Sequence, residues 1–253
     1  MGFSREKKRI IKLKKLAEAN PRRFKIQLAF VVACGYAVVF LYFLSLVALI
    51  TLLIIFAHRI PVRLIILLFI LLFFIARAFF QRIPPPSGLA ADKEKYSELF
   101  AVIQEAKELT NGPDLYKVMI NHEFNASVIQ IPRLWLLFGG YRNYLTLGLP
   151  LLASLSAEDL KAALCHEFGH LTKEHSKFRQ RVIKIAAVYE MLGELNIFIL
   201  LLFYPFLKIY FPILEGYIAV YQRSDEYEAD RIAFNAVGKT AYAAALWKFH
   251  VLG

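Results

Sequence analysis

Cysteine is scarce in this chain: Cys34 stands inside an apolar run, Cys165 stands beside a histidine, and there is no third. Two cysteines so placed exclude a disulfide framework, so nothing in the sequence requires an oxidising compartment. Charged residues are also few, at 20%, whereas apolar residues reach 58% against the usual value of about 45–50%. This balance excludes a disordered chain, a collagen-like chain and an ordinary cytosolic domain.

The chain has 20 Asp and Glu residues against 31 Lys and Arg residues, but most of this basic excess lies in one short segment. Residues 1–25 carry ten Lys and Arg against Glu6 and Glu18, a net charge of +8 that leaves +3 for the rest of the chain. A basic tail is not the basic folded face that nucleic-acid binding requires, so nucleic acid is not an expected partner. The tail would lie on anionic lipid as an amphipathic helix, with a plain topogenic charge cluster as the alternative.

Two long apolar runs follow the tail. Residues 26–57 contain no charge, and about 20 apolar residues suffice to cross a bilayer. The second run, 64–80, contains only Arg77 near its end, where a long side chain reaches the interface. We predict a transmembrane helical hairpin over 26–82; a cleaved signal peptide and a buried core helix are the alternatives. The positive-inside rule puts both ends of the hairpin in the cytosol.

A domain boundary follows the hairpin. Residues 83–88 contain three consecutive prolines and a Ser-Gly pair, which is typical of a stiff linker. Residues 89–110 have apolar positions at helical spacing and end in an Asn-Gly-Pro stop signal, so we predict a helix there. The runs 115–120 and 144–149 suit strands, with a Gly-Gly bend between them, and they predict a small sheet.

A further helix is expected to open with Ser156 as its N-cap and acidic residues in its first turn. It carries the sequence His166-Glu167-Phe168-Gly169-His170. Histidines at i and i+4 project from one helical face, close enough for their nitrogens to share one Zn²⁺ at about 2.0–2.1 Å. Glu167 would take a proton from the water that the metal activates. The pattern predicts a catalytic zinc site; a surface pair of histidines with a solvated glutamate is the alternative.

A catalytic zinc site needs a third protein ligand. The metzincin spacing would need a histidine and a glycine where Ser176 and Lys173 stand, which excludes that class. Downstream, Glu226 and Asp230 stand at i and i+4 on one helical face. Glu226 would serve as a carboxylate ligand, and Asp230 would orient a ligand histidine through its other ring nitrogen. A solvated acidic helix face is the alternative.

The HExxH sequence, followed some fifty residues later by R-x-x-E-x-x-A-D, resembles the HtpX and CAAX-prenyl-protease family of membrane zinc endopeptidases, which are gluzincins. The resemblance covers roughly residues 89–253 and includes Asn125-Ala126, similar to a pair on the strand that lines the cleft in that family. It implies one Zn²⁺ per chain and assigns the roles as follows. The ligands are His166, His170 and Glu226, the general base is Glu167, and Asp230 orients a ligand.

The expected fold class is mainly α, of the α+β type. An N-terminal transmembrane helical hairpin precedes a zincin-like metalloprotease domain with a small β-sheet and an HExxH active-site helix over 89–253. The expected function is a membrane-anchored zinc endopeptidase that cleaves membrane or unfolded proteins, with a substrate strand added along Asn125-Ala126. We expect an integral protein of the bacterial inner membrane whose N-terminus and catalytic domain are cytosolic. A prenyl-protein-type protease of the same family and a catalytically silent scaffold with a zinc site are the alternatives.

Residues 182–222 depart from that family's pattern, in which transmembrane helices lie between the two metal-binding motifs. Here acidic residues precede an apolar stretch that two prolines and Lys208 interrupt. An odd number of crossings would also put the ligands on opposite sides of the bilayer. We expect an interfacial element in which the chain turns back, with packing on the protease domain as the alternative. Arg223, Tyr227 and His175 are unranked candidates for stabilising the oxyanion.

Overall fold

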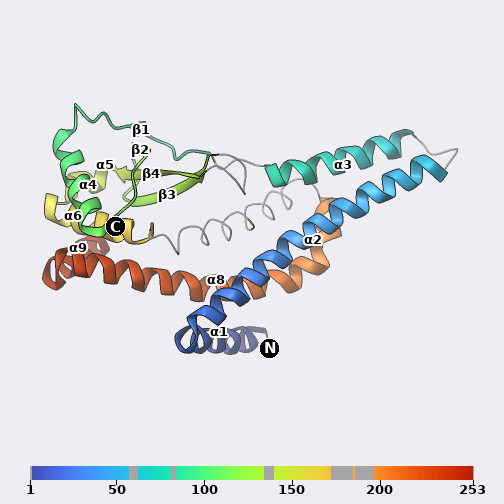
Figure 1. The fold of residues 1–253 in the computed structure, drawn as a ribbon, viewed down its shortest axis with the longest axis horizontal. Coiled ribbons are helices and arrows are strands. Elements are labelled where there is room, and N and C mark those ends of the chain that lie inside the picture. The colour runs from blue at the N-terminus through green and yellow to red at the C-terminus, as the bar shows by residue number, and fades with distance from the viewer. Residues whose placement is uncertain are drawn as a thin grey trace. The chain divides into compact units, whose positions relative to one another are not determined.

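The computed structural model describes residues 2–56, 62–80, 84–133, 140–171, 185 and 197–252, which are mostly helical with a small mixed sheet (Figure 1). By its internal contacts the chain divides into unit 1, residues 1–81 and 178–221, and unit 2, residues 82–177 and 222–253. The elements of unit 1 are α1 (Gly2–Ala19), α2 (Pro21–Phe56), α3 (Val62–Phe80) and the first part of α8 (Ile197–Val237). Those of unit 2 are β1 (Leu89–Ala90), α4 (Ser97–Thr110), β2 (Lys117–Asn121), β3 (Ala126–Pro132), β4 (Tyr141–Gly148), α5 (Leu149–Ser154), α6 (Ala157–Gly169), the rest of α8 and α9 (Lys239–Leu252).

The basic tail of unit 1 forms a helix that packs against its neighbours. Asn20 separates α1 from α2, and its side-chain oxygen accepts a hydrogen bond from the backbone N–H of Arg23 at 3.0 Å. Pro21 takes the first position of α2, where its missing N–H costs nothing. On α1, Leu13 is 7% exposed and packs in one apolar cluster with Leu28 of α2 and Leu214 of α8. The side of α1 that carries Leu13 is therefore covered within unit 1, whereas Ile11 is 48% exposed.

Both predicted apolar runs form helices. Within α2, the 35-residue stretch Pro21–Ile55 is long and apolar enough to cross a membrane, and its most apolar 18-residue window has a mean hydropathy of 3.0; it is the one such stretch among the described residues. The helix α3 covers the second run. The turn predicted between the runs falls mostly at 57–61, outside the described residues.

The helix α8 restricts where the turn expected within 182–222 could lie. From Ile197 onward this segment is a single helix that continues through Pro205 and Pro212 to Val237, so the chain does not turn back within 197–221. Tyr210 lies between the two prolines and Leu214 just after the second. Both side chains are buried in the apolar cluster of unit 1. This packing offsets the backbone hydrogen bonds that are lost because proline has no N–H. Residues 182–184 and 186–196 lie outside the described part.

The small predicted sheet is present in unit 2, with strand order β1-β2-β4-β3. The strand β4 is central: it pairs in parallel with β2 and antiparallel with β3, so β3 lies at the edge. The helix predicted over 89–110 begins only at Ser97, because Leu89 and Ala90 pair with Ile120 and Met119 as a strand instead. Its predicted end is confirmed: Asn111 takes a left-handed conformation with φ 50°.

The helix α6 lies on this sheet. Its predicted cap is confirmed: the Ser156 hydroxyl accepts from the backbone N–H of Asp159, whose carboxylate accepts from the Ser156 backbone N–H. One apolar face of α6 is buried together with Leu145 and Leu147 of β4. Side chains such as Leu164 and Phe168, each at most 1% exposed, stabilise this contact by about 1.5–3 kcal/mol each. The packing fixes the end of α6 relative to the sheet.

Candidate active site

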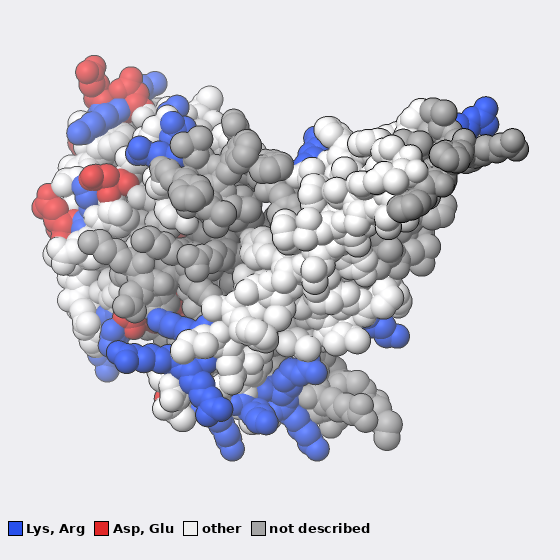
Figure 2. Space-filling view, turned by 45° about the vertical axis from the view of Figure 1, so that its right-hand side comes forward, with Lys and Arg blue, Asp and Glu red and all other residues white. Residues whose placement is uncertain are grey.

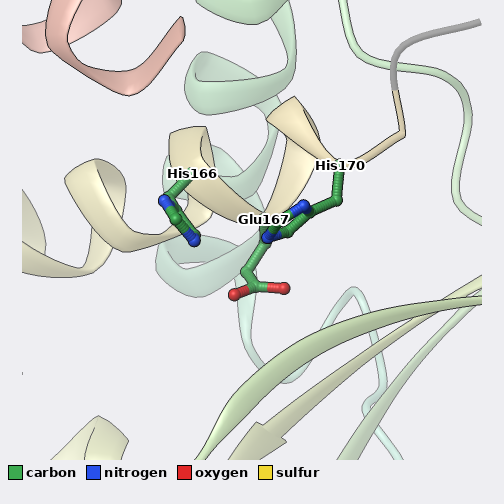
Figure 3. A group of neighbouring side chains, drawn as sticks. All are labelled: His166, Glu167 and His170. Carbon is green, nitrogen blue, oxygen red and sulfur yellow. The ribbon is translucent and has the colours of Figure 1, made fainter. Parts of the chain in front are cut away.

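Both histidines of the HExxH sequence stand at the C-terminal end of α6. His166 and Glu167 lie in its last turn, and His170 is the C-cap residue, still with right-handed helical dihedrals. Figure 3 shows both rings on the same side of the helix, with the Glu167 carboxylate pointing toward the sheet. The ring centres are 4.9 Å apart, and donor atoms of the three side chains lie within 4.8 Å of one another. The group could therefore hold a metal ion.

The second predicted motif reaches the same place from α8. Oε2 of Glu226 lies 3.4 Å from Nε2 of His166 and 3.6 Å from Nε2 of His170. Donors about 2.0–2.1 Å from one tetrahedral ion are about 3.3–3.4 Å apart, so the two distances to Glu226 are close to the spacing that a zinc site needs. The Glu226 side chain is 56% exposed, so the group formed by Glu226 and the two histidines is open to solvent on the side of Glu226. The donor set of two imidazoles and one carboxylate also fits zinc.

A close contact between backbones lets α8 approach the histidines. A Cβ atom added at Gly169 would lie only 2.8 Å from the Cα atom of Ala229, which is fully buried. Real side chains essentially never approach so closely, so this crossing requires a glycine on α6 and a small residue on α8. The contact lies one helical turn from both Glu226 and His166.

The outward nitrogen of each ring also has a partner. Nδ1 of His166 lies 3.1 Å from Oδ1 of Asp230, the contact that the role predicted for Asp230 would require. It also lies 2.8 Å from the hydroxyl of Tyr242 on α9, which itself donates to Asp230 Oδ1 at 2.6 Å. Nδ1 of His170 lies 3.1 Å from Oδ2 of Asp225. The sequence did not single out Asp225 or Tyr242: Asp225 was one of four acidic residues within 225–230, and no spacing rule links Tyr242 to the motif.

These surroundings shift the ionisation of the site. Burial lowers the pKa of His166, and the charge of His170 lowers it further, so the ring is neutral near pH 7. Burial also acts to lower the pKa of His170, but the hydrogen bond to Asp225 and the nearby carboxylates outweigh it, so that pKa is raised. Burial, followed by the bond to Asp230, raises the pKa of Tyr242, which therefore keeps its phenolic proton.

The edge strand β3 passes next to Glu167. The backbone N–H of Val128 donates a hydrogen bond to Oε2 of Glu167 at 3.2 Å. The carbonyl of Asn125 accepts from the N–H of Gly148, next to β4, so alternate residues Ala126, Val128 and Gln130 turn their backbone groups away from β4. Of the predicted substrate pair, Ala126 therefore faces the open edge, whereas Asn125 faces β4 with its backbone and keeps an exposed side chain.

The remaining candidate residues lie apart from this group or outside the described residues. Glu228, on the same helix as Glu226, pairs with Arg231 instead. Arg223 donates from Nε to the hydroxyl of Tyr227 at 3.2 Å on the exposed surface of α8. His175 lies outside the described residues. A cavity of about 730 Å³ is lined by α4 and the β1–β2 edge and contains none of the predicted site residues.

The arrangement of these side chains fits a metallopeptidase of the HExxH type. In a comparison with protein families, residues 138–251 match peptidase family M48. This match, over 114 of the 253 residues, confirms the predicted resemblance and indicates a metalloprotease, a hydrolase. Comparisons with curated proteins and with solved structures gave no match.

Proposed function

We propose that this chain is a membrane-anchored zinc endopeptidase in which His166, His170 and Glu226 hold the metal and Glu167 is the general base. The observation that carries the proposal is the convergence of two imidazole Nε2 atoms on one carboxylate oxygen, at 3.4 and 3.6 Å. Three ligands and an open side are typical of catalytic zinc sites, whereas structural sites are closed by four. The catalytically silent scaffold is therefore the weaker alternative.

When bound, zinc would supply Lewis acidity, lowering the pKa of a coordinated water from about 15.7 to about 7 and polarising the peptide carbonyl. The carboxylate of Glu167 stands beside the two histidines and takes the proton from the attacking water. It then returns this proton to the leaving amine. The hydrogen bond from Val128 holds one carboxylate oxygen toward the sheet and so restricts the side chain to this position.

An extended peptide would pair with the outer edge of β3. The backbone groups of Ala126, Val128 and Gln130 point to that side, and the bond from Val128 to Glu167 brings the same edge to the general base. Main-chain hydrogen bonds place few demands on sequence, which suits a protease that acts on unfolded or membrane proteins. The exposed side chain of Asn125 stands at the start of this edge.

The surface of unit 1 supports membrane anchoring. Only 17% of the most apolar window of α2 is buried, and side chains such as Phe40 and Leu41 are more than half exposed. An exposed apolar surface that extends along a helix in this way is typical of a surface that contacts a membrane. Figure 2 shows Lys and Arg side chains gathered at the lower edge of the view, where α1 lies in Figure 1. Exposed cations beside the start of α2 favour a cytosolic N-terminus, with α3 as the returning span.

Two measurements on the purified full chain in detergent test the enzyme assignment together: zinc content and cleavage of an unfolded casein-like substrate, for wild type and Glu167→Gln. We expect about one zinc in both proteins and cleavage only by wild type, because the substitution removes the base without removing a ligand. Equal cleavage by the variant would refute the role of Glu167. Absence of zinc from both after reconstitution would refute the metal site.

A separate measurement tests the anchor. Extraction of membranes with alkaline carbonate should leave the full chain in the membrane pellet. Release into the supernatant would contradict the transmembrane assignment without bearing on the zinc site.

A further inference from the structure

Asp225 and Tyr242 are buried polar side chains, each 5% exposed, that contact the two histidines on the side away from Glu226. We propose that they are positioning residues which, together with Asp230, hold both rings in the one tautomer and orientation that can bind the metal. The proposal rests on the zinc site proposed above. It extends that site from its ligands to the hydrogen-bonded groups that orient them.

The contacts of His166 allow one assignment of protons. The phenol of Tyr242 has a single proton, and it donates that proton to Asp230 at 2.6 Å. Its oxygen, 2.8 Å from Nδ1 of His166, can then only accept, and the carboxylate of Asp230 at 3.1 Å can only accept as well. Nδ1 must therefore carry the hydrogen, and the neutral ring presents a lone pair at Nε2.

The ring of His170 lies between two consecutive acids of α8. Oδ2 of Asp225 is 3.1 Å from Nδ1, and Oε2 of Glu226 is 3.6 Å from Nε2. Asp225 is buried and accepts only, so it holds a hydrogen on Nδ1, and in the neutral ring, the form that binds a metal, the lone pair is then on Nε2 toward Glu226. Because the two residues are adjacent on one helix, a single placement of α8 sets both the ligand carboxylate and the group that orients the ring.

The consequence is a site that is ordered before metal arrives. Both Nε2 lone pairs point toward the same carboxylate oxygen, and neither ring can rotate without breaking a hydrogen bond inside the domain. Groups of this kind, which hydrogen-bond to ligand histidines, typically change metal affinity by about 10–100-fold when they are removed. Tyr242 also links the site to α9, so the last helix of the chain takes part in metal binding without supplying a ligand.

The test is the zinc dissociation constant of the full chain in detergent, measured by competition with a chromophoric chelator. We expect Tyr242→Phe, which keeps the ring and its packing, and Asp225→Ala each to weaken binding about 10–100-fold. Asp225→Asn should recover part of the loss, because its amide oxygen can still accept from Nδ1. This rescue separates a positioning role from a merely structural one.

The matched control is a buried residue of the same domain away from the site. Tyr144→Phe changes a tyrosine that is 7% exposed in the sheet. It should keep the zinc affinity of wild type, even where thermal unfolding shows lost stability. Tight zinc binding by wild type, Asp225→Ala and Tyr242→Phe alike would overturn this inference and leave the proposed enzyme intact. Failure of wild type to bind zinc would instead overturn the proposed function.

Discussion

Replacing Gly169 by alanine should damage the metal site through the backbone, without touching a ligand. A Cβ at this position would lie 2.8 Å from Cα and 3.3 Å from the carbonyl oxygen of Ala229. Carbon atoms in contact lie about 3.5–4.0 Å apart, so α6 and α8 must separate by roughly 0.7 Å or more. Neither clashing atom belongs to a flexible side chain that could move aside.

The displacement acts directly on the donor atoms. Glu226 lies one turn before Ala229, and its distances of 3.4 and 3.6 Å to the two histidines would lengthen to about 4 Å, whereas a tetrahedral zinc site needs about 3.3–3.4 Å. We expect zinc to bind at least about tenfold more weakly, and the overpacking to cost about 1–3 kcal/mol of unfolding free energy. Chelator competition and thermal unfolding in detergent measure the two effects.

Gly216→Ala on α8 is the matched control. Its Cβ would meet the tip of Leu13 at 3.5 Å, which is ordinary contact, and alanine raises helix stability by up to about 1 kcal/mol over glycine. This variant should keep wild-type zinc affinity and unfold at the same or a higher temperature. If Gly169→Ala behaved like this control, the close approach of the two helices would not be what positions Glu226.

Two further predictions concern the elements that support the site. Burial acts to raise the pKa of Asp159, but hydrogen bonds from Lys248 and Ser156 outweigh it and lower that pKa, so the carboxylate stabilises the fold above about pH 4 and the effect is lost as pH falls further. The difference in unfolding temperature between wild type and Asp159→Asn should therefore shrink from pH 6 to about pH 3, and a constant difference would contradict this. Gly238, with φ +83° between α8 and α9, should not tolerate alanine, which costs about 1–2 kcal/mol there. Gly238→Ala should lower the unfolding temperature and loosen the hold of Tyr242 on the site, and an unchanged unfolding temperature would refute the strain.

The parts of the site that depend on local spacing could be predicted from the sequence. The i, i+4 spacing of His166 and His170 sets their relative placement wherever the helix forms, and the N-cap at Ser156 marks where it begins. The same spacing put Glu226 and Asp230 on one face of their helix, although the sequence left open whether that face was merely solvated. The distances to the histidines now support the ligand interpretation.

The parts that depend on tertiary contacts could not be predicted. Asp225 and Tyr242 reach the histidines only because α8 and α9 cross α6 at particular points, and no periodicity in the sequence marks those crossings. The start of α4 was placed too early because the apolar residues at 89–90 complete a strand pair with β2 instead. The outward edge of β3 likewise follows from pairing register, which turns the backbone groups of Ala126 and Val128, but not those of Asn125, away from β4.

The central claim, that Glu226 completes a zinc site with the two histidines, is tested most directly by the zinc dissociation constant of Glu226→Ala against Glu228→Ala. Both acids lie on the same helix two residues apart, but Glu228 pairs with Arg231 and Glu226 faces the histidines. We predict that Glu226→Ala weakens zinc binding by at least about 100-fold, while Glu228→Ala binds like wild type. Equal affinities for the two variants would contradict the account.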